Sequence, residues 1–137
     1  MAKKTKTQSD KPKKRSSSYS RNKGHAYETQ IAKELRDLGF TGVVTSRSES
    51  RRADDNKVDL IDTEGKLKWA IQLKKTQNTP SYFDIREEST IDNKDFVLFW
   101  AKQKKKEVNI CTVGEVVMID KQLFYELIKP YAQGEKN

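Results

Sequence analysis

Residues 58–74 read VDLIDTEGKLKWAIQLK, and this stretch decides the fold. Two runs rich in Val, Ile, Leu and Trp lie on either side of the polar segment 63–66 (TEGK), which has the composition of a turn. This arrangement predicts two strands, residues 58–62 and 67–74, joined as a hairpin by a four-residue turn. An antiparallel hairpin is therefore the expected centre of the domain.

The spacing of this hairpin places three polar residues together. With a turn at 63–66, paired positions sum to 129, so Asp59 lies opposite Ala70. Side chains alternate between the two faces of a strand, which puts Gln72 and Lys74 on the same face as Asp59. A half-exposed sheet with no function produces the same alternation, so the pattern alone leaves both interpretations open.

The segments around the hairpin predict a mixed central sheet flanked by helices, in the order α-β-β-β-α-β-β-α with a further short strand before the last helix. Tyr27, Ile31, Leu35 and Leu38 have helical spacing, and Gly39 follows as a stop signal. The further expected elements are a strand at 43–46, a helix at 80–89, a hairpin of strands 96–102 and 107–113, a strand at 116–119, and a helix at 121–129 that Asp120 caps and Pro130 ends. The fold class is therefore α/β, with one domain at residues 23–137.

The charge of the chain is concentrated at its start. The 137 residues carry 28 Lys and Arg against 20 Asp and Glu, for a net charge of +8. Residues 1–22 hold eight basic residues and one acid (8 − 1 = +7), whereas residues 23–137 hold 20 and 19 (20 − 19 = +1). Residues 1–22 have too few apolar side chains to fold, and we expect a disordered basic tail that contacts the phosphates of DNA or RNA. A solubilising or localisation tail is the alternative.

The composition excludes several classes of protein. A single cysteine, Cys111, rules out a disulfide framework and a Cys-based zinc site, and in its apolar strand we expect it to be buried. The longest apolar run is the six residues 96–101, far short of the roughly 20 that a membrane helix needs. The basic N-terminus lacks the apolar segment of a secretory signal, so we expect a protein that is not secreted.

A second acid completes a possible metal site. Glu28 lies at the border of the apolar stripe of the first helix, where a salt bridge is the simpler explanation. Two carboxylates and an amide oxygen (Glu28, Asp59 and Gln72) are the hard oxygen ligands that Mg²⁺ prefers. A lysine beside them, Lys74, can stabilise the charge of a phosphate. Phosphodiester hydrolysis needs these groups and little else.

These residues resemble a known family. The block Lys23-Gly24-x-x-x-Glu28, then Gly39-Phe40, then Asp59 in one strand and Gln72-Leu73-Lys74 in the next, is similar to the archaeal-type Holliday junction resolvases of the PD-(D/E)xK nuclease superfamily. The resemblance covers roughly residues 23–75. It implies a restriction-endonuclease-like core, Mg²⁺-dependent (or Mn²⁺-dependent) cleavage of branched DNA, a homodimer, and a location in the cytoplasm of a prokaryotic or virus-infected cell.

The resemblance also assigns roles. Glu28 corresponds to the helix glutamate, Asp59 to the metal-bridging aspartate and Lys74 to the catalytic lysine, and Ser48 falls where such resolvases carry a serine near the scissile phosphate. Val58 replaces a proline that shapes the strand entry. Gln72 replaces the second acid of the motif, so it would serve as an auxiliary ligand without charge. A nicking or restriction-type nuclease, or a catalytically weakened DNA-binding protein, is the alternative.

Basic residues outside the motif complete the expected DNA contacts. The loop before Asp59 is polar and basic, which is typical of a segment along a DNA backbone. Lys104, Lys105 and Lys106 are expected to solvate a hairpin tip, with DNA contact as the alternative. Phe124 and Tyr125 are expected to belong to the core or a dimer interface. The expected nucleic-acid contacts are Lys13, Lys14, Arg15, Arg21, Lys23, Ser48, Arg51 and Arg52.

Overall fold

The computed structural model describes residues 17–46, 58–89, 94–132 and 134. Within them the helices and strands follow the predicted order. The helices are α2 (Ser17–Leu38), α5 (Tyr82–Glu88) and α6 (Lys121–Ala132), and the strands are β1 (Val43–Thr45), β2 (Leu60–Asp62), β3 (Trp69–Thr76), β4 (Asp95–Lys106) and β5 (Asn109–Met118). No helix of this described part is both long enough and apolar enough to cross a membrane.

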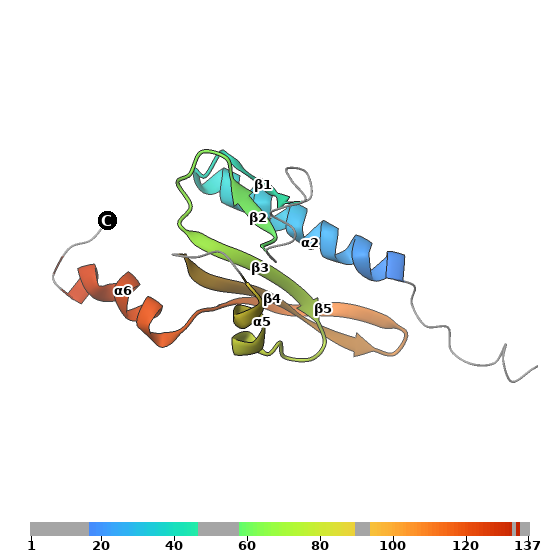
Figure 1. Ribbon diagram of the computed structural model, residues 1–137. Coiled ribbons are helices and arrows are strands. Elements are labelled where there is room, and N and C mark those ends of the chain that lie inside the picture. The colour runs from blue at the N-terminus through green and yellow to red at the C-terminus, as the bar shows by residue number, and fades with distance from the viewer. Residues whose placement is uncertain (1–16, 47–57, 90–93, 133, 135–137) are drawn as a thin grey trace, which may run out of the picture.

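The five strands form one mixed sheet in the order β1-β2-β3-β4-β5. β3 and β4 run parallel and every other neighbouring pair is antiparallel. A parallel pair needs a crossover connection, and the segment that contains α5 supplies it. α2 lies on one side of the sheet and α5 on the other (Figure 1). The α/β fold with a restriction-endonuclease-like core is thereby confirmed.

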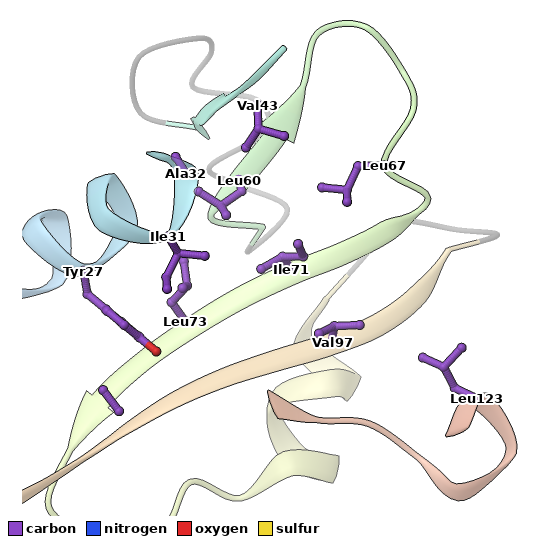
Figure 2. Packing of buried hydrophobic residues seen from close by; sticks show 11 residues of the cluster. Tyr27, Ile31, Ala32, Val43, Leu60, Leu67, Ile71, Leu73, Val97 and Leu123 are labelled. Atoms are coloured by element: carbon purple, nitrogen blue, oxygen red, sulfur yellow. The ribbon is translucent and has the colours of Figure 1, made fainter. Parts of the chain in front are cut away.

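The main core lies between α2 and the sheet. Tyr27 and Ile31 are each 2% exposed and pack with Leu60, Ile71 and Leu73 (Figure 2). A smaller cluster on the opposite face joins Ala70 and Leu98 to α5 residues. The first half of β3 therefore contributes apolar side chains to both faces, with Ile71 and Leu73 in the main core and Ala70 in the smaller cluster.

The end of α2 is fixed by its own sequence. The N–H of Gly39 donates to the carbonyl of Arg36, and the N–H of Phe40 donates to that of Leu35, both at 3.0 Å. Gly39 has a φ of 122°, which favours glycine. This is the Schellman arrangement, and the partly buried Phe40 and Leu35 pack on the same core. Leu38, in contrast, is 76% exposed and does not join the predicted stripe.

The register of the β2–β3 hairpin differs from the prediction by two residues. Leu60 pairs with Ile71, so paired positions sum to 131. The cause is Asp62, whose carboxylate accepts hydrogen bonds from the N–H groups of Glu64, Lys66 and Leu67 at 2.8–2.9 Å. These bonds hold a longer turn than the predicted four residues. Burial by itself would raise the pKa of Asp62, but the hydrogen bonds outweigh this effect and lower the pKa.

Several boundaries also differ from prediction. α2 begins at Ser17, so residues 17–22 of the predicted tail are helical, while residues 1–16 lie outside the described part. The predicted strands 107–113 and 116–119 are one strand, β5. Asp120 caps α6 through the N–H of Leu123, as predicted, but the helix continues past Pro130 to Ala132. The carbonyl that Pro130 leaves unbonded belongs to Glu126, which is exposed, so water can satisfy it.

Cys111 is exposed, not buried as predicted. It lies on β5, the edge strand, which has β4 as its one neighbour in the described sheet. The apolar residues around Cys111 therefore do not mark a covered face. Phe124 and Tyr125 of α6 are likewise about half exposed, which rules out the core part of their prediction.

Candidate active site

Asp59 lies where β2 and β3 separate. Its N–H donates to the carbonyl of Ile71 at 2.9 Å, and its carbonyl accepts from the N–H of Ser46 at 2.8 Å. Its carboxylate Oδ2 accepts a hydrogen bond from the N–H of Leu73 at 2.8 Å. The Leu73 N–H, which would bond a backbone carbonyl in a regular ladder, is thus bonded to the side-chain oxygen of Asp59. These three bonds fix both the backbone and the carboxylate of Asp59 against the middle of β3.

Gln72 is the β3 residue between the two that Asp59 contacts. Continuing the Leu60–Ile71 pair by one residue places it opposite Asp59. Its Oε1 atom is buried and has no hydrogen-bond partner among the described residues. A buried carbonyl oxygen without a partner costs about 1–3 kcal/mol, which a bound cation or water would offset. The observed register differs from the predicted one by two residues, which is one full period of side-chain alternation. Gln72 therefore still lies on the same face as Asp59, as predicted.

Lys74 follows on the same face of β3 and lines an open pocket of about 810 Å³. Lys23 and Gly24 of α2 line the same pocket, so the start of the sequence motif lies near its lysine, whereas Glu28, Asp59 and Gln72 are not among the lining residues. Lys75 also lines the pocket, and its Nζ lies 5.9 Å from the centre of the Tyr27 ring. The further lining residues are Leu73, Thr76, Gln77, Asn78, Pro80, Ser81 and Ile85.

Residues of β4 form hydrogen bonds to the segment 76–78, which lines one wall of this pocket. The indole Nε1 of Trp100 donates to the Thr76 hydroxyl at 3.0 Å and lies 3.3 Å from the Thr76 carbonyl. The ammonium of Lys102 donates to the carbonyl of Gln77 at 2.6 Å. The Thr76 hydroxyl in turn donates to the carbonyl of Asn78 at 2.8 Å. The segment after β3 is therefore a fixed wall of a cationic pocket.

Glu28 is only 6% exposed. It lies one helical turn after Gly24, which lines the pocket, and one turn before Ala32, which packs in the same core cluster as Leu60. Glu28 therefore lies on α2 between a residue of the pocket and a residue of the main core, and it does not itself line the pocket. A buried carboxylate is stable only when it is hydrogen-bonded, paired or bound to a cation.

The described residues hold no group of three or more His, Cys, Asp and Glu that could bind a metal ion. The candidate set contains two acids and one amide, so it falls outside that definition. Its donors are all oxygens, which fits Mg²⁺ or Mn²⁺ and excludes a thiolate or imidazole site. The buried, unpartnered Oε1 of Gln72 is consistent with such a ligand.

Two polar residues near the site had not been expected to belong to it. Ser46 is 1% exposed, its N–H bonds Asp59, and its hydroxyl has no partner among the described residues. Lys75 is half-buried beside Tyr27. Burial, and to a smaller extent the Glu115 carboxylate, raise the pKa of the Tyr27 hydroxyl far above its usual range, so it stays neutral. A serine at a strand end and the second of two lysines give no signal of burial in the sequence.

Some of the predicted DNA contacts lie in the described part of the chain and others lie outside it. Lys23 lines the pocket beside Lys74. Arg21 belongs to α2, and its side chain is not among those described. The contacts that lie outside the described residues are Lys13, Lys14, Arg15, Ser48, Arg51 and Arg52.

Comparison with known proteins identifies a family. The family model described as archaeal Holliday junction resolvase (Hjc) matches residues 19–112, which include all but the first two residues of α2 and every strand of the site. A search of curated proteins and a search of solved structures found no match.

Proposed function

The chain belongs to the archaeal Holliday junction resolvase family and is therefore an endonuclease of four-way DNA junctions; we propose that it cleaves them with a divalent metal ion. In this proposal Glu28, Asp59 and Gln72 hold the ion. The observation that carries it is the carboxylate of Asp59, fixed against β3 beside the buried and unpartnered Oε1 of Gln72.

The three side chains would contribute differently to binding a cation. Asp59 needs no reorganisation, because the Leu73 N–H already orients its carboxylate. Glu28 supplies the second negative charge from α2, and Gln72 supplies a neutral oxygen. When bound, Mg²⁺ or Mn²⁺ would neutralise developing phosphate charge and lower the pKa of an attacking water.

Lys74 is the proposed phosphate ligand. Its position on the same face of β3, two residues after Gln72, and its place in the pocket put its ammonium within reach of a phosphate in that pocket. The ammonium would stabilise charge that develops in the transition state and orient the water. Lys23 lines the same pocket and would bind a neighbouring phosphate.

The test compares a four-way junction with a linear duplex of the same sequence, in Mg²⁺ and in excess EDTA. We expect cleavage of the junction in Mg²⁺ at least about tenfold faster than of the duplex, and no cleavage in EDTA. Equal rates on both substrates would favour a nicking or restriction-type enzyme. Binding without cleavage in either Mg²⁺ or Mn²⁺ would favour the catalytically weakened protein that the uncharged Gln72 suggests.

The basic residues near the N-terminus and in the sequence before Asp59 fit the same substrate. We propose that Lys13, Lys14, Arg15 and Arg21 contact the DNA backbone without sequence preference, and that Ser48, Arg51 and Arg52 lie near the cleaved strand. The proposed location is the cytoplasm of a prokaryotic or virus-infected cell, where such DNA occurs.

A homodimer is part of the proposal. Resolution of a junction takes two strand cuts, and the chain offers one candidate site, so a two-fold pair supplies both. β5 is an edge strand with half-exposed Val116 and Val117, and α6 exposes Phe124, Tyr125 and Ile128 beside it in sequence. Exposed apolar surface on an edge strand favours pairing with a second chain.

Sedimentation equilibrium tests this dimer. The wild type is expected at twice the chain mass of 15.9 kDa. The double variant Val116→Glu/Phe124→Glu should sediment as a single chain, because it places charge in the proposed interface. Phe83→Glu, at a 60% exposed residue of α5, is the matched control and should remain a dimer. A wild type of single-chain mass, or a double variant that still pairs, would contradict the proposal.

A further inference from the structure

The hairpin of β4 and β5 extends past the rest of the sheet. β3 ends at Thr76, which pairs with Lys102, whereas β4 continues to Lys106. From Gln103 onward β4 pairs with β5 alone within the described sheet. Figure 1 shows this ribbon projecting past the arrowhead of β3. We call residues 103–112 the basic hairpin.

The basic hairpin carries an excess of positive charge. Lys104, Lys105 and Lys106 are exposed, and the one acid between 103 and 112 is Glu107 (3 − 1 = +2). No ion pair of the described residues involves the three lysines. Since they are consecutive in a strand, their ammonium groups lie on both faces of the ribbon. Gln103 joins its strands by donating to the Thr112 hydroxyl at 2.8 Å.

The basic hairpin projects from the same end of the sheet as the pocket. Because β3 and β4 are parallel and Lys74 pairs with Trp100, Lys106 lies six residues beyond the level of Lys74. At roughly 3.3 Å per residue this is about 20 Å. Lys102 lies between them and already holds the pocket wall through Gln77. Cationic side chains therefore continue from the pocket to the tip.

We propose that the basic hairpin is a second DNA contact that binds the backbone of the duplex arm beside the cleavage site. DNA rises about 3.4 Å per base pair, so a reach of about 20 Å corresponds to roughly six base pairs. A two-stranded ribbon fits the major groove, and its lysines would neutralise phosphates without reading bases. The contact would make cleavage depend on arm length. This inference rests on the proposed function, because the distance is measured from Lys74.

The test uses the triple variant Lys104→Ala/Lys105→Ala/Lys106→Ala in the full chain. The charge-matched control is Lys66→Ala/Lys94→Ala/Lys129→Ala, whose members are exposed; Lys66 precedes β3, Lys94 precedes β4 and Lys129 is in α6. All six side chains are exposed, so thermal unfolding should stay near wild type. Junction affinity is measured in Ca²⁺ between 50 and 200 mM salt (roughly the range over which phosphate contacts dominate), and cleavage in Mg²⁺.

With junctions whose arms are about 15 base pairs long, we expect the triple variant to lose about tenfold in affinity and to have a salt slope smaller by two to three phosphates. When one arm is shortened to about four base pairs and closed by a hairpin loop, wild type should fall to the level of the triple variant for that arm. A triple variant equal to the control on long arms, or a wild type insensitive to arm length, would overturn the inference. Failure of the proposed catalytic site would remove cleavage in all variants but leave these binding differences in place.

Discussion

Asp59→Asn is expected to reduce junction cleavage in Mg²⁺ at least about a thousandfold, because the metal-bound carboxylate contributes several kcal/mol of transition-state stabilisation. An asparagine has the same shape, and its amide oxygen can still accept the 2.8 Å bond from the Leu73 N–H. The backbone bonds to Ile71 and Ser46 are unaffected. The variant should therefore fold and bind the junction within about threefold of wild type.

Asp62→Asn is the matched control for this experiment. It changes the same residue type three positions further along the chain, at the end of β2, where the carboxylate holds a turn and not the proposed ion. It should lower thermal stability and retain cleavage. Single-turnover cleavage of both variants, with binding measured in Ca²⁺, distinguishes the roles. Normal cleavage by Asp59→Asn, or loss of cleavage in both variants, would contradict the assignment.

Lys74→Met is expected to lower the rate of the chemical step by about 100- to 1000-fold, since it removes a cation that faces the developing phosphate charge. Methionine retains most of the apolar stem of the lysine, so the shape of the pocket that Lys74 lines should persist. Junction affinity should change only a few-fold, because a single phosphate contact is lost among many.

The adjacent Lys75 offers a stringent comparison. It lines the same pocket but lies beside Tyr27, on the opposite face of β3. Lys75→Met should raise KM modestly with little change in kcat, whereas Lys74→Met should lower kcat. Equal effects on kcat would show that neither lysine is placed specifically at the scissile phosphate.

The sequence was sufficient to predict the order of the helices and strands. It was also sufficient to predict that Gln72 and Lys74 of β3 share one face of the sheet. Alternation along 67–74 determines which side chains point together, and an error of two residues in register leaves that face unchanged. The register itself depended on the Asp62 carboxylate, which bonds three N–H groups of the turn. A side chain that bonds backbone groups two to five residues ahead leaves no periodic signal.

Burial was harder to predict than pairing. Cys111 lies in an apolar strand, yet it is exposed because β5 is the edge of the sheet and no described element covers it. Ser46 is buried because its N–H joins β1 to Asp59. Both outcomes depend on which strands become neighbours. That order is set by contacts between residues distant in the sequence.

The exposed thiol makes the natural chain suitable for site-specific labelling. Cys111 is the single cysteine of the sequence and pairs with Lys104 in the basic hairpin. A maleimide fluorophore would therefore attach at one known position without any substitution. Energy transfer to an acceptor dye at the end of a DNA arm would then report, in real time, how near the hairpin comes to each arm during a single reaction.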